Sequence, residues 1–245
     1  MDLGLQDHVY VVTGGSRGLG PAAAKVLTAE GAKVVVTGRG ESVADAARTL
    51  GGDGHAVGVV ADNAAPDSAE KVVGTAMRRF GRLDGALVSV GGPPVGPAME
   101  VADQEWRDSF ESTFLGALRL ARTAARMFTA GGSIALVLSS SVREPIPGLA
   151  VSNGLRPGLA MVAKTLVDEL GGSKIRVNGI MPAYIATERQ KELAGLTGGG
   201  PPDNALRRMG EPEEFARAAA FLLSPAAGCM TGVMLPVDGG ALRVL

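Results

Sequence analysis

The chain has 245 residues, 46% hydrophobic and 4% aromatic, which suits one α/β domain with an aliphatic core. It carries 24 Lys and Arg against 25 Asp and Glu, and this balance argues against nucleic acid or an anionic membrane as a partner. The single cysteine excludes an intramolecular disulfide. Because the chain has only this cysteine and two distant histidines as soft metal ligands, we expect no metal site.

Localisation is predicted from two features of the sequence. No apolar run reaches the roughly 18 residues that a membrane span needs. Residues 1–4 also lack the basic and apolar regions of a signal peptide. We therefore expect a cytoplasmic protein that does not enter a membrane.

The first predicted element is a buried strand over 9–12, followed by a glycine-rich turn and a helix over 22–29. Gly14, Gly18 and Gly20 follow the spacing G-x-x-x-G-x-G. One glycine permits the tight turn, another lets the backbone approach a pyrophosphate, and the third lets the helix pack on the strand. This strand–turn–helix context predicts a dinucleotide site, made by Gly14, Ser16, Arg17, Gly18, Leu19 and Gly20.

The second predicted strand, 34–36, ends in Gly38 and Arg39. In NAD-selective folds an acidic residue near this point takes the ribose 2′-hydroxyl. Here Arg39, together with Arg17, favours a 2′-phosphate, so NADP(H) is expected rather than NAD(H). The alternative interpretation is that both arginines are solvated surface residues.

Two further strands end at candidate cofactor residues. The strand over 56–60 ends near Asp62, which is expected to meet the adenine or to cap a helix over 64–80. The strand over 85–90 ends at Gly91, in front of a proline-rich turn that is predicted to pass along the cofactor.

A long helix is predicted over 103–128, because apolar side chains recur at i, i+3 and i+4. This stripe is expected to lie in the core or in a subunit interface. Its members are Trp106, Phe110, Phe114, Ala117, Leu118, Ala121 and Ala125.

The rest of the chain continues the alternation of strands and helices. Residues 192–205 show no periodicity and are predicted to form a mobile loop, either a lid or a tolerated insertion. The alternation predicts one doubly wound parallel sheet of about seven strands with helices on both faces. The remaining predicted elements are strands over 133–138, 174–181 and 233–237 and a helix over 211–223.

These motifs together resemble the short-chain dehydrogenase/reductase superfamily, near its 3-oxoacyl-carrier-protein reductase-like members, over almost the whole chain. The resemblance is carried by residues 13–20, 177–182 with Thr187, 208–214 and 237–240. It implies a single Rossmann-type domain over 1–245 with a mobile substrate loop at about 186–207. It also implies an NAD(P)-dependent oxidoreductase for a small-molecule carbonyl or acyl thioester, a homotetramer or homodimer, and cofactor contacts from Pro182 and Thr187.

The same resemblance implies that Asn, Ser, Tyr and Lys catalyse carbonyl reduction. Tyr donates a proton, and Lys lowers the Tyr pKa and binds the nicotinamide ribose. Ser139 matches the family's Ser, but Ser152 and Arg156 stand where Tyr and Lys are expected, and Thr113 where Asn is expected. A divergent subgroup is similar in having S-N-x-x-R in place of Y-x-x-x-K.

The predicted catalytic set is therefore Ser139, Ser152, Arg156 and Tyr184. Arg156 is expected to hold the ribose or a substrate oxyanion. Tyr184 is the candidate substitute acid, with a ring packed under the cofactor as the alternative. Pro157 is expected to delay the start of the helix and so to move Arg156.

Two functions remain open on this sequence. The first is an NADP(H)-dependent oxidoreductase with a non-standard catalytic set. The second is a non-catalytic dinucleotide-binding homologue that acts as a sensor or subunit partner.

Overall fold

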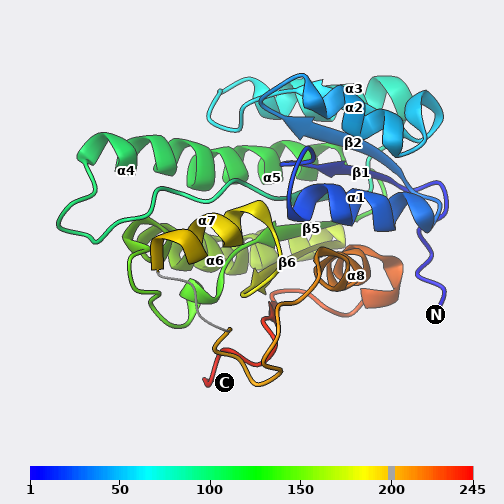
Figure 1. The fold of residues 1–245 in the computed structure, drawn as a ribbon. Helices are drawn as coiled ribbons and strands as arrows, with labels where there is room; N and C mark the ends of the chain where they lie inside the picture. Colours follow the sequence, from blue (N-terminus) through cyan, green and yellow to red (C-terminus); the bar gives the residue numbers. More distant parts are fainter. Residues whose placement is uncertain (198–201, 245) are drawn as a thin grey trace.

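The computed structural model describes residues 1–197 and 202–244, which fold around a parallel sheet of seven strands (Figure 1). The strand order is β3-β2-β1-β4-β5-β6-β7, so the direction of winding reverses between β1 and β4. In doubly wound sheets this switch point opens the crevice that takes the ligand. The strands are β1 (Val9–Val12), β2 (Lys33–Gly38), β3 (Ala56–Val60), β4 (Gly85–Val88), β5 (Gly132–Val137), β6 (Ile175–Pro182) and β7 (Met234–Val237).

The central strand β1 shows why the apolar runs fold into this sheet. All four of its residues are buried, as expected for a strand covered on both faces. Tyr10 pairs with Val34 of β2 on one side and with Gly85 of β4 on the other. A Cβ at Gly85 would lie 2.6 Å from the Tyr10 ring, so glycine makes room for the one aromatic side chain in β1.

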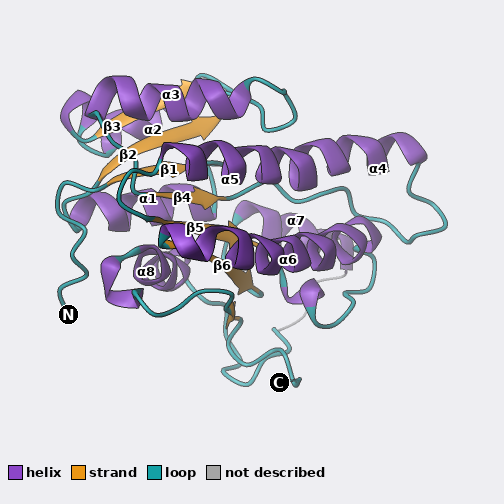
Figure 2. Ribbon diagram, turned by 180° about the vertical axis from the view of Figure 1, so that it is seen from behind, coloured by secondary structure: helices purple, strands orange, loops and turns teal. Residues whose placement is uncertain are grey.

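Helices cover both faces of the sheet, and two apolar clusters fill the layers between (Figures 1 and 2). One face carries α1 (Leu19–Ala29), α2 (Ser42–Thr49) and α8 (Pro212–Leu223). The other carries α3 (Ser68–Phe80), α5 (Gly116–Met127) and α6 (Ala150–Leu170). This arrangement confirms the predicted α/β fold class with a Rossmann-type doubly wound sheet.

The predicted helix over 103–128 is divided in the structure. It consists of α4 (Asp103–Ser109), a π-helical turn over Phe110–Leu115, and α5. Part of its apolar stripe packs within the chain, since a Cβ at Gly154 of α6 would lie 2.9 Å from the Trp106 ring. Phe110 stacks on Phe114 with ring centroids 5.1 Å apart and is 40% exposed.

The absence of secondary structure predicted over 192–205 is wrong in part. Helix α7 (Glu188–Thr197) begins before this stretch and covers residues 192–197 of it, and it lies at the same end of the sheet as α4 (Figures 1 and 2). Its weak amphipathic pattern explains why periodicity missed it. Residues 198–201, also part of the predicted loop, lie outside the described residues.

Helix α6 begins at Ala150, so the expected delay of its start is wrong. The Asn153 side chain accepts a hydrogen bond from the Ile146 N–H at 3.0 Å and donates one to the Ile146 carbonyl at 2.9 Å. These two bonds tie the first turn to the loop before it. Pro157 lies inside the helix and removes one backbone donor, and the helix continues through it.

A buried amide fixes the approach to β7. Asn178 of β6 is fully buried; its Nδ2 donates to the Met230 carbonyl at 2.9 Å, and its Oδ1 accepts from the Val233 N–H at 3.0 Å. Within residues 1–197 and 202–244, no helix has the length and apolarity to cross a membrane.

Candidate cofactor and active site

The glycine-rich turn is anchored to the end of β4. Thr13 Oγ1 donates to the Ser89 carbonyl at 2.7 Å and accepts from the Ser89 N–H at 2.8 Å. Gly14 adopts φ +62°, and a Cβ there would lie 2.8 Å from the same carbonyl oxygen. A side chain at position 14 would therefore separate the turn from β4.

The turn leaves the start of α1 open to an anion. Gly18 is the N-cap, no side chain caps the first turn, and the first turn contains no acidic residue. The free N–H groups of such a helix start attract a phosphate. A Cβ at Gly18 would have Thr187 Cγ2, at 4.0 Å, as its nearest neighbour, so Thr187 faces the turn across an open space. These residues fit the pyrophosphate of a dinucleotide.

At the end of β2 a side chain at position 38 would crowd Ser16 of the glycine-rich turn. A Cβ at Gly38 would lie 2.9 Å from Ser16 Oγ. Arg17 and Arg39 are both exposed, and neither forms an ion pair within the described chain. Two cations without acidic partners thus flank the place where a ribose 2′-substituent is expected.

The Asp62 side chain stabilises a turn in the loop after β3 and does not cap a helix. Its Oδ1 accepts from the Ala64 N–H at 3.0 Å, whereas α3 begins only at Ser68. The alternative interpretation of Asp62 as a helix N-cap is therefore wrong. A surface hollow of about 580 Å³ adjoins it, lined by Arg39, Asp62, Ala64, Pro66, Asp108, Glu111, Ser112 and Arg119.

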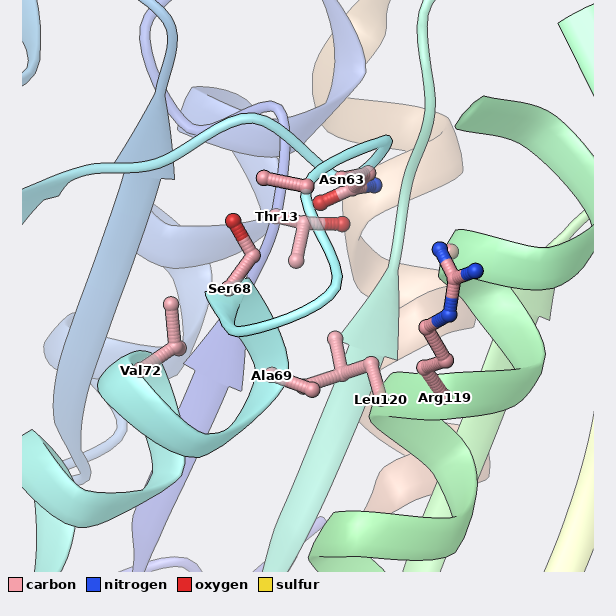
Figure 3. A pocket seen from close by; sticks show the side chains of 9 residues that line it. Thr13, Asn63, Ser68, Ala69, Val72, Arg119 and Leu120 are labelled. Atoms are coloured by element: carbon pink, nitrogen blue, oxygen red, sulfur yellow. The ribbon is translucent and has the colours of Figure 1, made fainter. Parts of the chain in front are cut away.

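A second, much smaller cavity lies between Thr13, at the start of the glycine-rich turn, and helices α3 and α5 (Figure 3). Thr13, Asn63, Ser68 and Arg119 line it with apolar side chains of α3 and α5. Its volume of about 10 Å³ has room for about one water molecule. It therefore takes no part of a nucleotide or substrate.

Three of the four predicted catalytic residues, Ser139, Ser152 and Arg156, gather beside the end of β5. Ser139 Oγ accepts from the Ser141 N–H at 3.1 Å, and Ser141 Oγ lies 3.1 Å from Ser152 Oγ. One turn further along α6, Arg156 Nη1 donates to the Val137 carbonyl at 2.6 Å. Ser152 therefore reaches Ser139 only through Ser141, and its hydroxyl is buried in that contact.

Arg156 is a buried cation, 6% exposed. No acidic side chain lies within ion-pair distance of it among the residues that the structure describes. Burial lowers the pKa of its guanidinium to about 10, and the charge of nearby Arg189 lowers it as well.

Tyr184 lies on the segment that leaves β6, two residues after Pro182. Its backbone is left-handed, with φ +51°, and its carbonyl accepts from the Gly210 N–H at 2.8 Å. The ring is half-buried, and within the described part of the chain its hydroxyl forms no hydrogen bond. No hydrogen bond joins Tyr184 to Ser139, Ser152 or Arg156.

The sequence reasoning missed Arg189 and the role of Ser141. Arg189, on α7, donates from Nη2 to the Pro93 carbonyl at 2.6 Å and lies against Gly92, next to the predicted cofactor residue Gly91. It falls in the substrate loop predicted at about 186–207, and no signal in the sequence marked it. The run of three serines after β5 was a signal for Ser141, but the pairing with Ser152 depends on tertiary structure.

Comparison with known proteins decides the family. A family model described as Enoyl-(Acyl carrier protein) reductase matches residues 14–241. The chain belongs to the short-chain dehydrogenase/reductase superfamily. This confirms the resemblance that the sequence motifs indicate, and it makes the chain a member of a family of oxidoreductases.

Individual relatives agree with this assignment. An uncharacterized oxidoreductase of Methylorubrum extorquens is 34% identical, over 96% of this chain and 98% of the relative. The cis-4-hydroxycyclohexanecarboxylate dehydrogenase of Sinomonas cyclohexanicum is 35% identical, over 97% and 98%. The L-sorbose reductase from Gluconobacter frateurii, solved with NADPH and L-sorbose, is 31% identical, with a TM-score of 0.92 over 100% of both chains.

Proposed function

We propose that this protein is an NADP(H)-dependent oxidoreductase that interconverts a carbonyl and an alcohol on a small molecule, in the manner of 3-oxoacyl-carrier-protein reductases. The observation that carries the proposal is the position of Ser139 and Arg156 at the end of β5, at the ligand-binding edge of the sheet. Ser152 and Arg156 replace the Tyr and Lys that the family resemblance implies.

The proposed cofactor is NADPH, which supplies a hydride when bound. The start of α1 and Gly18 hold the pyrophosphate, and Thr187 faces it. Arg17 and Arg39 bind the 2′-phosphate, because both are exposed and free of ion pairs within the described chain. Asp62 and Gly91 border the adenosine half, and Pro182 the nicotinamide half.

In this proposal the side chains act on the substrate oxygen. Ser139 and Arg156 donate hydrogen bonds that stabilise the negative charge as the carbonyl oxygen becomes an alkoxide. Arg156 keeps its proton near neutral pH, since its pKa is about 10. Tyr184, with a hydroxyl unbound within the described chain, delivers the proton. Ser152 positions Ser141 instead of donating, because its hydroxyl is buried against Ser141 Oγ.

The cofactor proposal is tested by titrating the protein with NADPH and NADH. We expect Arg39→Ala to weaken NADPH binding about 10- to 100-fold, the range for a charged hydrogen bond, and to leave NADH unchanged. Arg122→Ala, at an exposed position of α5, is the matched control. The proposal is rejected if neither cofactor binds at about millimolar concentration, because the dissociation constant would then exceed that of a micromolar site by about three powers of ten.

The chemistry is tested with a panel of ketones and 3-oxoacyl thioesters, followed by NADPH absorbance. Tyr184→Phe keeps the ring and removes the hydroxyl, so we expect turnover to fall about 10²- to 10⁴-fold. Ser152→Ala is expected to change it far less. Turnover that survives Tyr184→Phe unchanged rejects Tyr184 as the acid. Tight NADPH binding without turnover of any compound favours the sensor or subunit function, because the protein then binds the cofactor without catalysing hydride transfer.

The proposed assembly is a homotetramer or homodimer. Light scattering of the purified chain measures its mass in solution. A mass of one chain at micromolar concentration contradicts this part of the proposal.

A further inference from the structure

The starting observation is a buried positive charge that lacks a counter-ion. Arg156 is 6% exposed, and its one hydrogen bond within the described chain goes to the neutral Val137 carbonyl. Buried charges in proteins are ordinarily paired with an opposite charge or a metal, because removal from water is costly. A guanidinium in this position is therefore incomplete without an anion.

A second guanidinium adds to the same charge. Arg189 of α7 is near enough to Arg156 to disfavour its charged form. Arg189 Nη2 is held by the Pro93 carbonyl at 2.6 Å, and Nη1 lies 3.3 Å from the carboxylate of Glu192, which is 59% exposed. Because Glu192 is exposed and screened by water, its carboxylate offsets only part of the repulsion between the two arginines.

The position of the two arginines matches a ligand site. Arg156 is anchored at the end of β5 and Arg189 at the turn after β4, two adjacent parallel strands. Ligands in doubly wound sheets bind beyond these strand ends. Ser139, the proposed hydrogen-bond donor to the carbonyl oxygen, follows β5 by two residues.

We propose that the substrate carries a carboxylate, in addition to its reactive carbonyl or alcohol. Arg189 binds this carboxylate together with those N–H groups of Arg156 that do not serve the carbonyl oxygen. The planar forks of two arginines match the two oxygens of a carboxylate. The negative group also removes the repulsion between the two guanidinium groups. This inference rests on the proposed function for the existence of a substrate, but the binding of a carboxylate can be measured without turnover.

The test is calorimetry of the full chain with matched acids and amides, each pair having one shape and differing in charge. Acetate with acetamide, benzoate with benzamide, and cyclohexanecarboxylate with cyclohexanecarboxamide are titrated with and without NADP+. We expect the acid of at least one pair to bind about 10- to 100-fold more tightly than its amide. Arg189→Gln and Arg156→Met should each reduce that preference to less than about threefold, since one charged hydrogen-bond donor is lost. Arg122→Met should retain it.

Two further outcomes decide the inference. A cofactor phosphate is the other source of anionic oxygens, so NADPH binding is measured in the same variants. If Arg189→Gln weakens NADPH and the acid by the same factor, the anion belongs to the cofactor and the inference is overturned. It is also overturned if no acid binds more tightly than its amide.

Loss of carboxylate binding must be distinguished from misfolding of a variant and from absence of turnover. Arg156→Met removes a buried group, so its circular dichroism is checked, and the partly exposed Arg189→Gln gives an independent answer if that variant fails to fold. A charge preference lost in Arg189→Gln supports the inference even if no ketone is reduced. That combination rejects the proposed oxidoreductase function and leaves an anion-binding dinucleotide-fold protein.

Discussion

Substitution of Gly20 by alanine tests whether close backbone packing sets the shape of the cofactor turn. Gly20 is buried at the start of α1. Its new Cβ would lie 2.7 Å from the Gly14 carbonyl carbon and 3.0 Å from the Thr13 carbonyl oxygen, both of them backbone atoms. Because neither neighbour is a flexible side chain, the turn itself must move.

The expected magnitude follows from the kind of crowding. An extra methyl in a tightly packed site costs about 1–3 kcal/mol. Displacement of the turn also moves the N–H groups at the start of α1, and a loss of about 1.4 kcal/mol in binding is a tenfold change in the dissociation constant. We therefore expect Gly20→Ala to unfold at lower urea concentration and to bind NADPH at least about tenfold more weakly. Urea denaturation without cofactor and NADPH fluorescence measure the two effects.

Two matched glycines separate crowding from the general effect of adding a methyl. Gly40→Ala has no atom within 4 Å of the new Cβ, so its stability should stay within about 0.5 kcal/mol of the wild type. Gly18→Ala is uncrowded, but φ +73° with ψ −129° lies in a region used almost only by glycine, which costs about 1–3 kcal/mol in an L-residue. If Gly20→Ala matches the wild type in both stability and NADPH affinity, close packing of the turn against α1 does not shape the site.

Three further predictions concern the supporting structure. Asn178→Ala leaves the Val233 N–H without its partner and leaves the Met230 carbonyl with Arg176 alone, so it should lower the free energy of unfolding by about 1–3 kcal/mol in urea denaturation. Asn153→Ala removes both bonds to Ile146, so we expect a loss of about 1–2 kcal/mol in the same assay. Burial lowers the pKa of Arg156 to about 10, so above that pH the unfolded state binds more protons than the native state and stability rises with pH. The destabilisation by charged Arg156 is therefore present below pH 10. Relative to Arg156→Met, the wild type should therefore gain free energy of unfolding as pH rises through 10, and a pH-independent difference between the two would contradict this assignment.

Local chemistry made much of this fold predictable. Runs such as Val9–Val12 are apolar without interruption, and only a strand buried on both faces accommodates such a run in a short segment. Glycine, which alone adopts φ +62° and +73° without strain, marked the turn at Gly14 and Gly18. These features act over a few residues, so the α/β class, the strand–turn–helix unit and the family resemblance were all recognisable from the chain.

Local rules gave the wrong result where contacts distant in sequence outweighed them. Pro157 and Gly154 both disfavour a helix, but α6 forms because Asn153 holds the preceding loop and Trp106 packs where a side chain at 154 would project. The amphipathic pattern of α7 is too weak for the sequence to predict a helix there. Asp62 resembled a helix cap, whereas the chain turns once more before α3 begins.

The sequence by itself determined that Gly14, Arg39, Asp62, Gly91 and Ser139 lie beyond the carboxyl ends of the strands, because each follows a predicted strand and parallel strands end on one side. The tertiary structure alone decided how side chains of the helices reach that edge and pair there. Ser152 meets Ser141, Arg156 reaches the Val137 carbonyl, and Arg189 crosses from α7 to the turn after β4. These contacts depend on how α6 and α7 pack against β4 and β5, and spacing along the chain carries no information about that packing.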